Sequence, residues 1–316
     1  MKACVDIGGT KVAVSLAPEG GGERQLLARR SEPTAKHGDN GALARQILRL
    51  LAEACAEQGL PGTQAISAVG VASCGPFVLN QGRVELAAPN ICGGLAGPAR
   101  GLPNDWRTAP LEAPLREHFA HLPGDRLRVE NDAVAALEAE RRWGALQGLA
   151  HCAYVTWSTG IGVGLCVDGR LLHGKNGNAG HAGHMFVNDD ASGALCGCGN
   201  VGDVEGLTAG NAFARRFGQE PPALLAAAKA GDAAALARVD DICRVLGRML
   251  YNLVATLDLQ RISIGGGVFW HHRDFLLPRL QREIDGRLAA LTTGFALVPA
   301  GLGEQVGDYA ALALVS

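Results

Sequence analysis

The sequence predicts an α/β protein made of two related domains around a central cleft. Its 316 residues amount to about two domains at roughly 150 residues each. A strand, a glycine turn and a second strand occur near residue 8 and again near residue 160. Hydrophobic residues form 47% of the chain and charged residues 19%, which is enough apolar material for two cores and excludes global disorder.

The first half alternates apolar strand patterns with helical ones. Apolar side chains at Leu43, Ile47, Leu50 and Ala54 recur at helical spacing and predict a helix over residues 40–58. The stretch 76–110 is rich in proline and glycine and is expected to be a long, partly irregular excursion near a cleft. We expect strands at Ala3–Ile7, Val12–Leu16, Gln25–Arg29, Ile66–Ala72 and Leu127–Glu130, and a helix that ends near Trp143.

The second half opens with the same pattern. Further on, helices are expected over residues 208–256, between the last two strands and at Gln305–Val315. The strands expected here are His151–Trp157, Val163–Val167, a short one after Asp168-Gly169, Arg261–Ile264 and Phe295–Pro299.

This repetition predicts a small N-terminal α/β domain at 1–125 and a large α/β domain at 126–302. A C-terminal helix, about 303–316, is expected to rejoin the small domain. Two glycine turns facing each other across a cleft would suit nucleotide phosphates. Two unrelated glycine hairpins would give the same local pattern.

Composition excludes several classes of partner. The net charge is −2, the isoelectric point is about 6.5 and no basic run occurs, so we expect no nucleic-acid partner. Neither a signal peptide nor an apolar run of about 18 residues is visible, so no membrane partner is expected. Most of the nine cysteines stand singly in apolar contexts, which is typical of a reducing compartment. The expected location is cytoplasmic.

The first glycine turn carries groups suited to phosphate. Gly8 and Gly9 expose backbone N–H groups, and Thr10 adds a hydroxyl donor. Lys11 offers a compact positive charge for a transferring phosphoryl group, and Asp6 is placed to orient Mg²⁺ through water. A tight hairpin capped by the aspartate is the simpler alternative.

Two further glycine clusters support a divided phosphate site. Thr159 and Gly160 lie in the second turn, Ser158–Gly162, and Gly265, Gly266 and Gly267 follow a later strand. Neither turn fits the P-loop pattern or the Rossmann fingerprint.

Four potential metal ligands lie within twenty residues. They are His184, Cys196, Cys198 and Asp203. Thiolates with an imidazole are a typical zinc set, and aspartate also binds zinc, so the sequence predicts a structural zinc site. A weaker or empty site is the alternative.

Asp132 follows a short strand and begins a helix. A carboxylate within reach of a hydroxyl can accept its proton during phosphoryl transfer. Carboxylates also favour helix N-termini, so a plain helix cap explains the local pattern equally well.

Taken in order, these motifs resemble the ROK (repressor, open reading frame, kinase) family of the actin-like ATPase superfamily. The resemblance covers essentially the whole chain. Its motifs are Asp6–Lys11, Gly70–Pro76, Glu130–Ala133, Thr159–Gly162, Gly180–His184, Cys196–Gly199 and Ile264–Val268.

The resemblance implies two actin-like (ribonuclease H-like) domains, ATP, Mg²⁺ and transfer of the γ-phosphoryl group to the 6-hydroxyl of a hexose. It makes Asp132 the catalytic base and Asn131 a sugar ligand. It places Gly75 and Asn90 beside the sugar, and Gly265–Gly267 at the adenosine. It also implies a homodimer or homotetramer.

The chain departs from the family pattern at two positions. Asp203 stands where the family has a third cysteine, and His181 stands where it has a sugar-binding glutamate; His184 and Glu205, two further sugar-contacting positions, are retained. A neutral imidazole offers one donor and one acceptor where a carboxylate accepts twice. The change hints at an amino sugar such as kanosamine, glucosamine or N-acetylmannosamine. Alternatively, His181 points to solvent.

Two other functions are weighed against a kinase. ROK repressors carry a helix-turn-helix ahead of the first phosphate motif, and the first expected strand leaves no room for one. A non-catalytic sugar-binding sensor is allowed by the two departures. The presence of Asp6, Lys11 and Asp132 favours an enzyme.

Overall fold

The computed structural model describes residues 1–20, 24–95, 101–189 and 193–316. The chain divides into two compact units. The first comprises Met1–Ala139, His173–Asn178 and Gly307–Ser316, and the second comprises Glu140–Leu172 and Ala179–Val306. The domain boundaries expected from the sequence stay a prediction.

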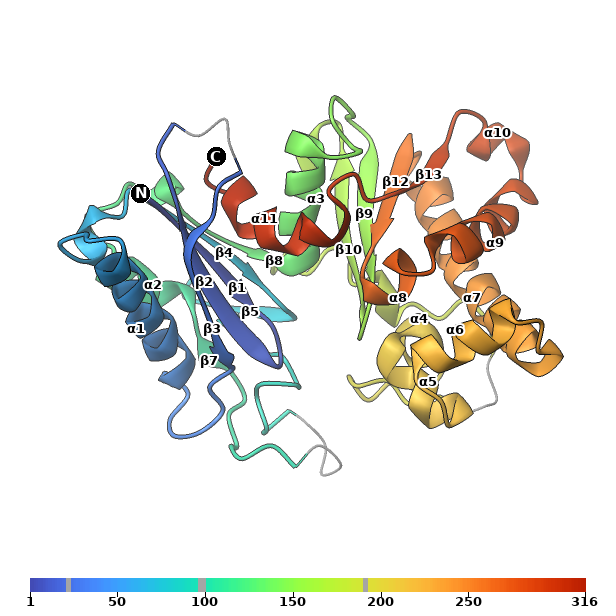
Figure 1. Ribbon diagram of the computed structural model, residues 1–316, viewed down its shortest axis with the longest axis horizontal. Coiled ribbons are helices and arrows are strands. Elements are labelled where there is room, and N and C mark those ends of the chain that lie inside the picture. Colours follow the sequence, from blue (N-terminus) through green and yellow to red (C-terminus); the bar gives the residue numbers. More distant parts are fainter. Residues whose placement is uncertain (21–23, 96–100, 190–192) are drawn as a thin grey trace. The chain divides into compact units, whose positions relative to one another are not determined.

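The first unit is built on a five-stranded sheet of order β3-β2-β1-β4-β8 (Figure 1). The hairpin strands β1, β2 and β3 are antiparallel, whereas β1, β4 and β8 run parallel. The strands are β1 (Lys2–Ile7), β2 (Lys11–Ala17), β3 (Leu27–Pro33), β4 (Ala68–Ser73) and β8 (Leu127–Asn131).

Alternation along β1 decides which helix covers which face of this sheet. Ala3, Val5 and Ile7 belong to the core that includes helix α1 (Ala42–Glu57). Intervening Cys4 and Asp6 face α11 (Val306–Ala313), as the two-residue period of a strand requires. A Cβ at Gly70 of β4 would lie 2.0 Å from the carbonyl oxygen of Ala311, so α11 crosses this strand in close contact. A shorter helix, α2 (Glu112–His118), packs near α1.

The second unit repeats the same strand order, β11-β10-β9-β12-β13. Here too the first three strands form antiparallel pairs, and β9, β12 and β13 run parallel. The strands are β9 (Cys152–Trp157), β10 (Ile161–Val167), β11 (Arg170–Leu171), β12 (Arg261–Gly265) and β13 (Ala296–Pro299). The structure therefore confirms the internal repeat expected from the two glycine turns.

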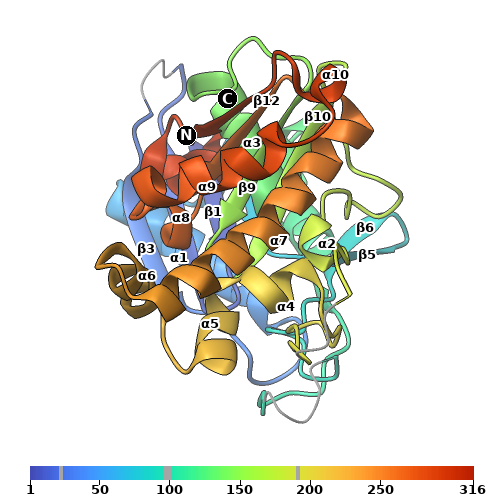
Figure 2. The same ribbon diagram turned by 90° about the vertical axis from the view of Figure 1, so that its right-hand side faces the viewer.

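Helices of the second unit pack against its sheet and complete its hydrophobic core. The 25-residue helix α7 packs against α6 and α9, and its apolar face joins the core of the sheet (Figure 2). Helix α3 (Asp132–Trp143) begins in the first unit and ends in the second. The remaining helices are α4 (Val204–Thr208), α5 (Gly210–Phe217), α6 (Pro221–Lys229), α7 (Ala233–Leu257), α8 (Gly267–Trp270), α9 (Arg273–Asp285) and α10 (Ala289–Thr292).

In the first unit, the stretch expected to be partly irregular also contains strands, and the bounds expected for the third strand are wrong. The stretch 76–110 contains a three-stranded sheet of β5 (Phe77–Asn80), β6 (Arg83–Leu86) and β7 (Ala109–Pro110). Gln81 and Gly82 both have positive φ, as a two-residue hairpin turn requires. The third strand runs over Leu27–Pro33 instead of Gln25–Arg29, because this edge strand is polar, with three charged residues, and shows little apolar alternation.

The other expected elements are present within a few residues of their predicted bounds. Among the described residues, no helix combines the length and apolarity that crossing a membrane requires.

Candidate functional site

Three parallel strands of the first unit end side by side. Ile7 of β1 pairs with Ser73 of β4, which in turn pairs with Asn131 of β8. The N–H of Cys74 donates to the carbonyl oxygen of Ile7 at 2.8 Å and extends this alignment past the strand ends. The carboxyl ends of parallel strands commonly carry ligand sites. The predicted residues of this unit therefore emerge from one edge of one sheet.

The first turn, residues 8–11, leaves backbone donors open. Three of its four carbonyl groups are occupied: Gly8 O accepts from Thr34 Oγ1 at 2.7 Å, Thr10 O accepts from Thr34 N–H at 3.0 Å, and Lys11 O accepts from Gly8 N–H at 2.9 Å. No acceptor in the described part of the chain binds the N–H groups of Gly9 and Thr10. These donors and the exposed Lys11 side chain can meet an anion.

Asn90 packs directly over the first turn. A Cβ at Gly9 would lie 2.2 Å from Asn90 Nδ2, so any larger residue would have to displace this amide. Asn90 Oδ1 is buried and has no hydrogen-bond partner among the described residues. Buried polar atoms are rarely left unpaired, so this oxygen is suited to accept from a ligand hydroxyl.

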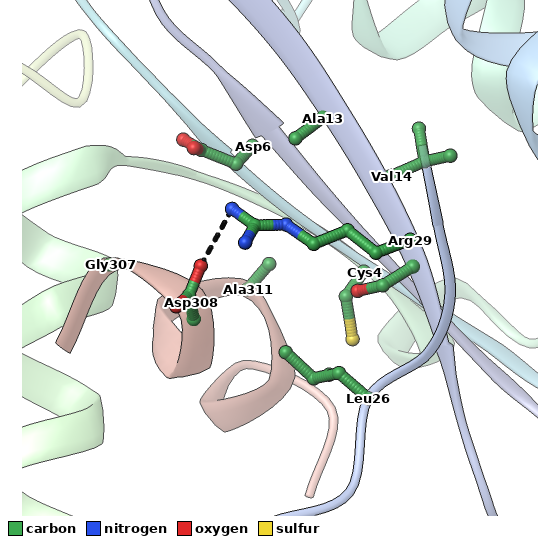
Figure 3. Close-up of a pocket in the computed structure, with 10 residues that line it drawn as sticks. Cys4, Asp6, Ala13, Val14, Leu26, Arg29, Gly307, Asp308 and Ala311 are labelled. Carbon is green, nitrogen blue, oxygen red and sulfur yellow. Dashed lines mark ion pairs between the residues drawn. The ribbon is translucent and has the colours of Figure 1, made fainter. Parts of the chain in front are cut away.

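Asp6 lies on the α11 face of the sheet, beside an ion pair (Figure 3). Arg29 of β3 donates to Asp308 of α11 at 2.8 Å, and its guanidinium points toward Asp6. Burial raises the pKa of Asp6 to about 6, although the positive charges of Lys11 and Arg29 oppose the shift. Sequence reasoning missed Arg29 and Asp308, since neither stands in a motif.

Asp132 and Asn131 occupy the junction between β8 and α3. The N–H of Ala133 donates to Asp132 Oδ1 at 2.8 Å and to Asn131 Oδ1 at 3.0 Å. Asn131 is buried, whereas Asp132 is half-buried at the positive end of the helix dipole. Both the cap and the base described above are compatible with this position.

Gly75 begins the turn that follows β4, and that turn is tied to a distant segment. Asn178 accepts from the N–H of Phe77 through Oδ1 and donates to the Phe77 carbonyl through Nδ2, both at 2.7 Å. The Asn178 side chain thus makes the same pair of backbone hydrogen bonds with Phe77 that a residue of a neighbouring antiparallel strand would make. No local sequence pattern indicates this contact, which joins residues 101 positions apart.

The second turn, residues 158–161, occupies the corresponding position in the second unit. Its Ser158 N–H donates to Gly160 O at 3.0 Å, and Ile161 N–H donates to Glu205 Oε2 at 2.9 Å. The N–H groups of Thr159 and Gly160 have no acceptor among the described residues. This turn thus offers two neighbouring donors, as the first does, but no charged side chain of its own.

The three glycines at the end of β12, Gly265–Gly267, lie beside the second turn. Gly266 has φ +89°, and a Cβ there would lie 2.4 Å from the Trp157 carbonyl oxygen. A Cβ at Gly265 would lie 2.8 Å from the Tyr154 hydroxyl, whereas Gly267 faces open space. The structure therefore brings the predicted nucleotide residues of this unit together.

The four predicted metal ligands converge. One ligand atom from each of His184, Cys196, Cys198 and Asp203 lies within 4.8 Å of all the others. His184 Nδ1 is 3.1 Å from Asp203 Oδ2 and 3.7 Å from Cys196 Sγ, and Cys198 Sγ is 3.6 Å from Asp203 Oδ2. A tetrahedral zinc ion keeps its ligand atoms about 3.3–3.8 Å apart. The donor set and spacing fit that ion.

Burial and hydrogen bonds shift the pKa values of three members of this four-residue cluster. Burial raises the pKa of the Cys196 thiol, and the hydrogen bond to Asp203 raises the pKa of His184. Burial also acts to raise the pKa of Asp203, but hydrogen bonds from His184, Gly206 and Asn200 outweigh it and lower the value.

The predicted sugar residues of the second unit surround the cluster. The His181 and His184 rings stack with centroids 6.0 Å apart, and both side chains are half-buried. Because His184 Nδ1 faces the cluster, its Nε2 remains for another partner. Glu205 lies on α4, where it contacts Cys196 as well as the second turn.

Comparison with known proteins gives a consistent family. The ROK family model matches residues 2–316. Glucokinase of Aeropyrum pernix is 29% identical over 98% of this chain and 95% of its own length. N-acetylmannosamine kinase of Citrobacter koseri is 32% identical over 84% of this chain and 82% of its own length.

Solved structures agree with the fold. The ROK hexokinase of Thermus thermophilus is 30% identical, with a TM-score of 0.73 over 99% of this chain and 97% of its own. A ROK family glucokinase of Streptomyces griseus, in complex with glucose and AMPPNP, is 27% identical, with a TM-score of 0.68 over 98% and 97%. These likenesses confirm the expected actin-like α/β fold.

Proposed function

This chain belongs to the ROK family, and on that premise we propose that it is an ATP-dependent sugar kinase. The observation that carries the proposal is the common sheet edge in the first unit, where the open donors of the first turn and the Asp132 carboxylate follow aligned strands. Phosphoryl transfer needs both features: donors for phosphate and a base for the accepting hydroxyl.

In the proposed reaction, Asp132 accepts the proton of the sugar 6-hydroxyl. A bond forms between that oxygen and the γ-phosphorus, the bond from the γ-phosphorus to its bridging oxygen breaks, and ADP leaves. Lys11 and the N–H groups of Gly9 and Thr10 stabilise the charge on the transferring group. Asp6 is the residue placed to hold Mg²⁺ through water, and the ion would neutralise phosphate charge.

We assign sugar binding to Gly75, Asn90 and Asn131 of the first unit and to three residues of the second. The unpaired Asn90 Oδ1 supports this role, because a sugar hydroxyl would satisfy it. The three from the second unit are His181, His184 and Glu205. Nucleotide binding is assigned to the second turn and to Gly265–Gly267.

N-acetylmannosamine is a second candidate substrate beside glucose. The named relatives include kinases of both kinds. An imidazole at His181 can donate to the carbonyl oxygen of an acetamido group, which glucose lacks. An ionised glutamate at that position could only accept hydrogen bonds and could not donate to that carbonyl oxygen.

We further propose that the four-residue cluster holds a structural zinc ion. All four residues are intrinsic to the second unit, and their spacing suits the ion. Held there, zinc would fix His184 through Nδ1 and present Nε2 to the sugar.

We also propose a reducing, cytoplasmic location, which the absence of disulfide bonds among the nine cysteines supports.

The test is ADP release with ATP and Mg²⁺ across glucose, mannose, fructose, allose, glucosamine, kanosamine, N-acetylglucosamine and N-acetylmannosamine. Asp132→Ala should reduce turnover on the accepted sugar by about 10²–10⁴-fold. Asp125→Ala, which changes an exposed aspartate of the same unit, should leave it unchanged. A folded, zinc-loaded protein that uses none of these sugars contradicts the kinase and favours a sugar-binding sensor.

A further inference from the structure

Asp203 uses its two carboxylate oxygens for two different partners. Oδ2 faces the four-residue cluster, 3.1 Å from His184 Nδ1. Oδ1 accepts the N–H of Gly206 at 2.7 Å and caps helix α4. The side chain is fully buried, so water does not compete with these two partners for its oxygens. A metal held by Oδ2 would therefore also fix the start of α4.

Glu205 carries this connection from α4 to the second turn. Its Oε2 accepts the Ile161 N–H at 2.9 Å, and the thiol of Cys196 donates to its Oε1 at 3.5 Å. A Cβ at Gly160 would lie 2.8 Å from Oε2, so the carboxylate lies directly against the turn. Glu205 thus lies beside a predicted metal ligand and against the backbone of the turn, and its bond from Cys196 belongs to the metal-free form, because a zinc-bound thiolate has no proton to donate.

The segment that follows Glu205 holds the rest of the turn. Gly210 N–H donates to Ser158 O at 2.8 Å, and Asn211 N–H donates to Thr159 O at 3.1 Å. Trp157, which precedes the turn, donates from its indole to Thr208 O at 2.8 Å. The turn is therefore bordered by residues 205–211, and this segment begins two residues after the predicted metal ligand Asp203.

We propose that the metal-loaded cluster sets the affinity for the nucleotide, with Glu205 as the positioning residue that transmits its state to the second turn. This rests on the proposed function, which places nucleotide phosphates at that turn. Loading fixes Asp203 and α4, and Glu205 then holds Ile161 so that the open N–H groups of Thr159 and Gly160 keep one orientation. Unloading releases this constraint.

The test measures AMPPNP binding by calorimetry, with Mg²⁺ and without sugar, so that a role of Glu205 in sugar binding does not enter. Zinc content is measured in every sample. Zinc-loaded wild type should bind AMPPNP about tenfold more tightly than chelator-treated protein, a typical coupling between two sites. Glu205→Ala should retain stoichiometric zinc and lose a similar factor. Glu220→Ala, an exposed glutamate of the same unit, should bind as wild type.

Hydrogen exchange at the Ile161 amide separates this role from general destabilisation. Protection should be high in loaded wild type and fall in zinc-loaded Glu205→Ala, while protection within β12 stays unchanged. Equal AMPPNP affinity in loaded wild type and loaded Glu205→Ala would overturn the inference. If loaded wild type binds no AMPPNP, the proposed kinase function fails as well, which is a distinguishable result.

Discussion

The two glycine turns occupy equivalent positions in two sheets of the same strand order, yet they are equipped differently. The first turn carries Lys11, is packed beneath Asn90 and lies close to Asp6. The second turn is uncharged and is held by Glu205, which comes from a helix capped by a predicted metal ligand. The scaffold supplies paired backbone donors in both places, and the surrounding residues decide what those donors can do.

This difference suggests a division of labour. Charge is concentrated where bonds would change, because preorganised charge stabilises a transition state more than a ground state. The second turn, where the nucleotide would only be held, instead makes several hydrogen bonds to residues 205–211. Variants that separate these two effects can break or sharpen the comparison.

The largest expected effect is at Lys11. Lys11→Met removes the only charge carried by either turn and should lower kcat by about 10²–10³-fold. The counterpart change Thr159→Val in the second turn should lower kcat by less than about tenfold, since it removes no charge. Steady-state kinetics on the accepted sugar compares them. Equal losses in the two variants would contradict the division of labour.

A second contrast concerns buried carboxylates outside the turns. Glu140 is fully buried and accepts from Ala145 N–H, Gly301 N–H, Leu302 N–H and the Ser263 hydroxyl at 2.8–3.0 Å. Glu140→Ala should cost at least about 3 kcal/mol of unfolding free energy, because each orphaned buried donor costs about 1–3 kcal/mol.

Glu112 is a buried carboxylate of the first unit that serves for comparison. It accepts from Val84 N–H at 2.9 Å and pairs with Arg116 and Arg83, whose side chains reach solvent. Glu112→Ala should therefore cost less, about 1–2 kcal/mol. Urea unfolding of both variants gives the order. A larger loss at Glu112 would show that charged partners, and not orphaned backbone donors, dominate.

The third prediction concerns how the Asp6 carboxyl makes stability depend on pH. The second turn has no charged side chain for a matching test. Because burial raises the pKa of Asp6 from 3.8 to about 6, the folded state binds the proton more tightly than the unfolded state. Stability from this group is thus full below pH 3.8 and is lost as pH rises through about 6. Without Mg²⁺, Asp6→Asn should be more stable than wild type above pH 6, by at most about 3 kcal/mol.

Urea midpoints between pH 4 and pH 8 test this sign. The difference between Asp6→Asn and wild type should shrink toward pH 4. A constant difference across the range would mean that the Asp6 carboxylate is well solvated or fully paired by Arg29 and Lys11.

The smallest effects should come from adding one methyl group to each turn. Gly9→Ala displaces Asn90 and should raise the sugar KM, whereas Gly160→Ala displaces the Glu205 carboxylate and should raise the Kd for AMPPNP. Overpacking of about 1 kcal/mol corresponds to roughly fivefold in each constant. Both constants changing together in both variants would argue against separate roles.

The sequence predicted the repeat because its glycine turns stand at the ends of apolar strands, a local and strong signal. It also predicted the convergence of His184, Cys196, Cys198 and Asp203, since their spacing is short. The edge strand β3 was misplaced because exposed strands carry little apolar alternation. The β5–β6 hairpin was overlooked although Gln81-Gly82 stands between two short apolar runs.

Other features depend on tertiary contacts that no local pattern encodes. Arg29 and Asp308 meet near Asp6 only because α11 folds against the first sheet. Asn178 binds Phe77 across 101 residues. The hydrogen bond from Ile161 to Glu205 likewise joins residues 44 positions apart and depends on the folded structure.

The most direct test of the central claim is the position of the phosphoryl group on the product. Phosphorus NMR of a reaction with ATP, Mg²⁺ and the accepted sugar should show one sugar monophosphate whose phosphorus couples to the two protons at carbon 6. It should form in step with ADP, and with Asp132→Ala it should form about 10²–10⁴-fold more slowly. Phosphate on another carbon, or release of inorganic phosphate alone, would contradict the assignment of Asp132 as the base for a 6-hydroxyl.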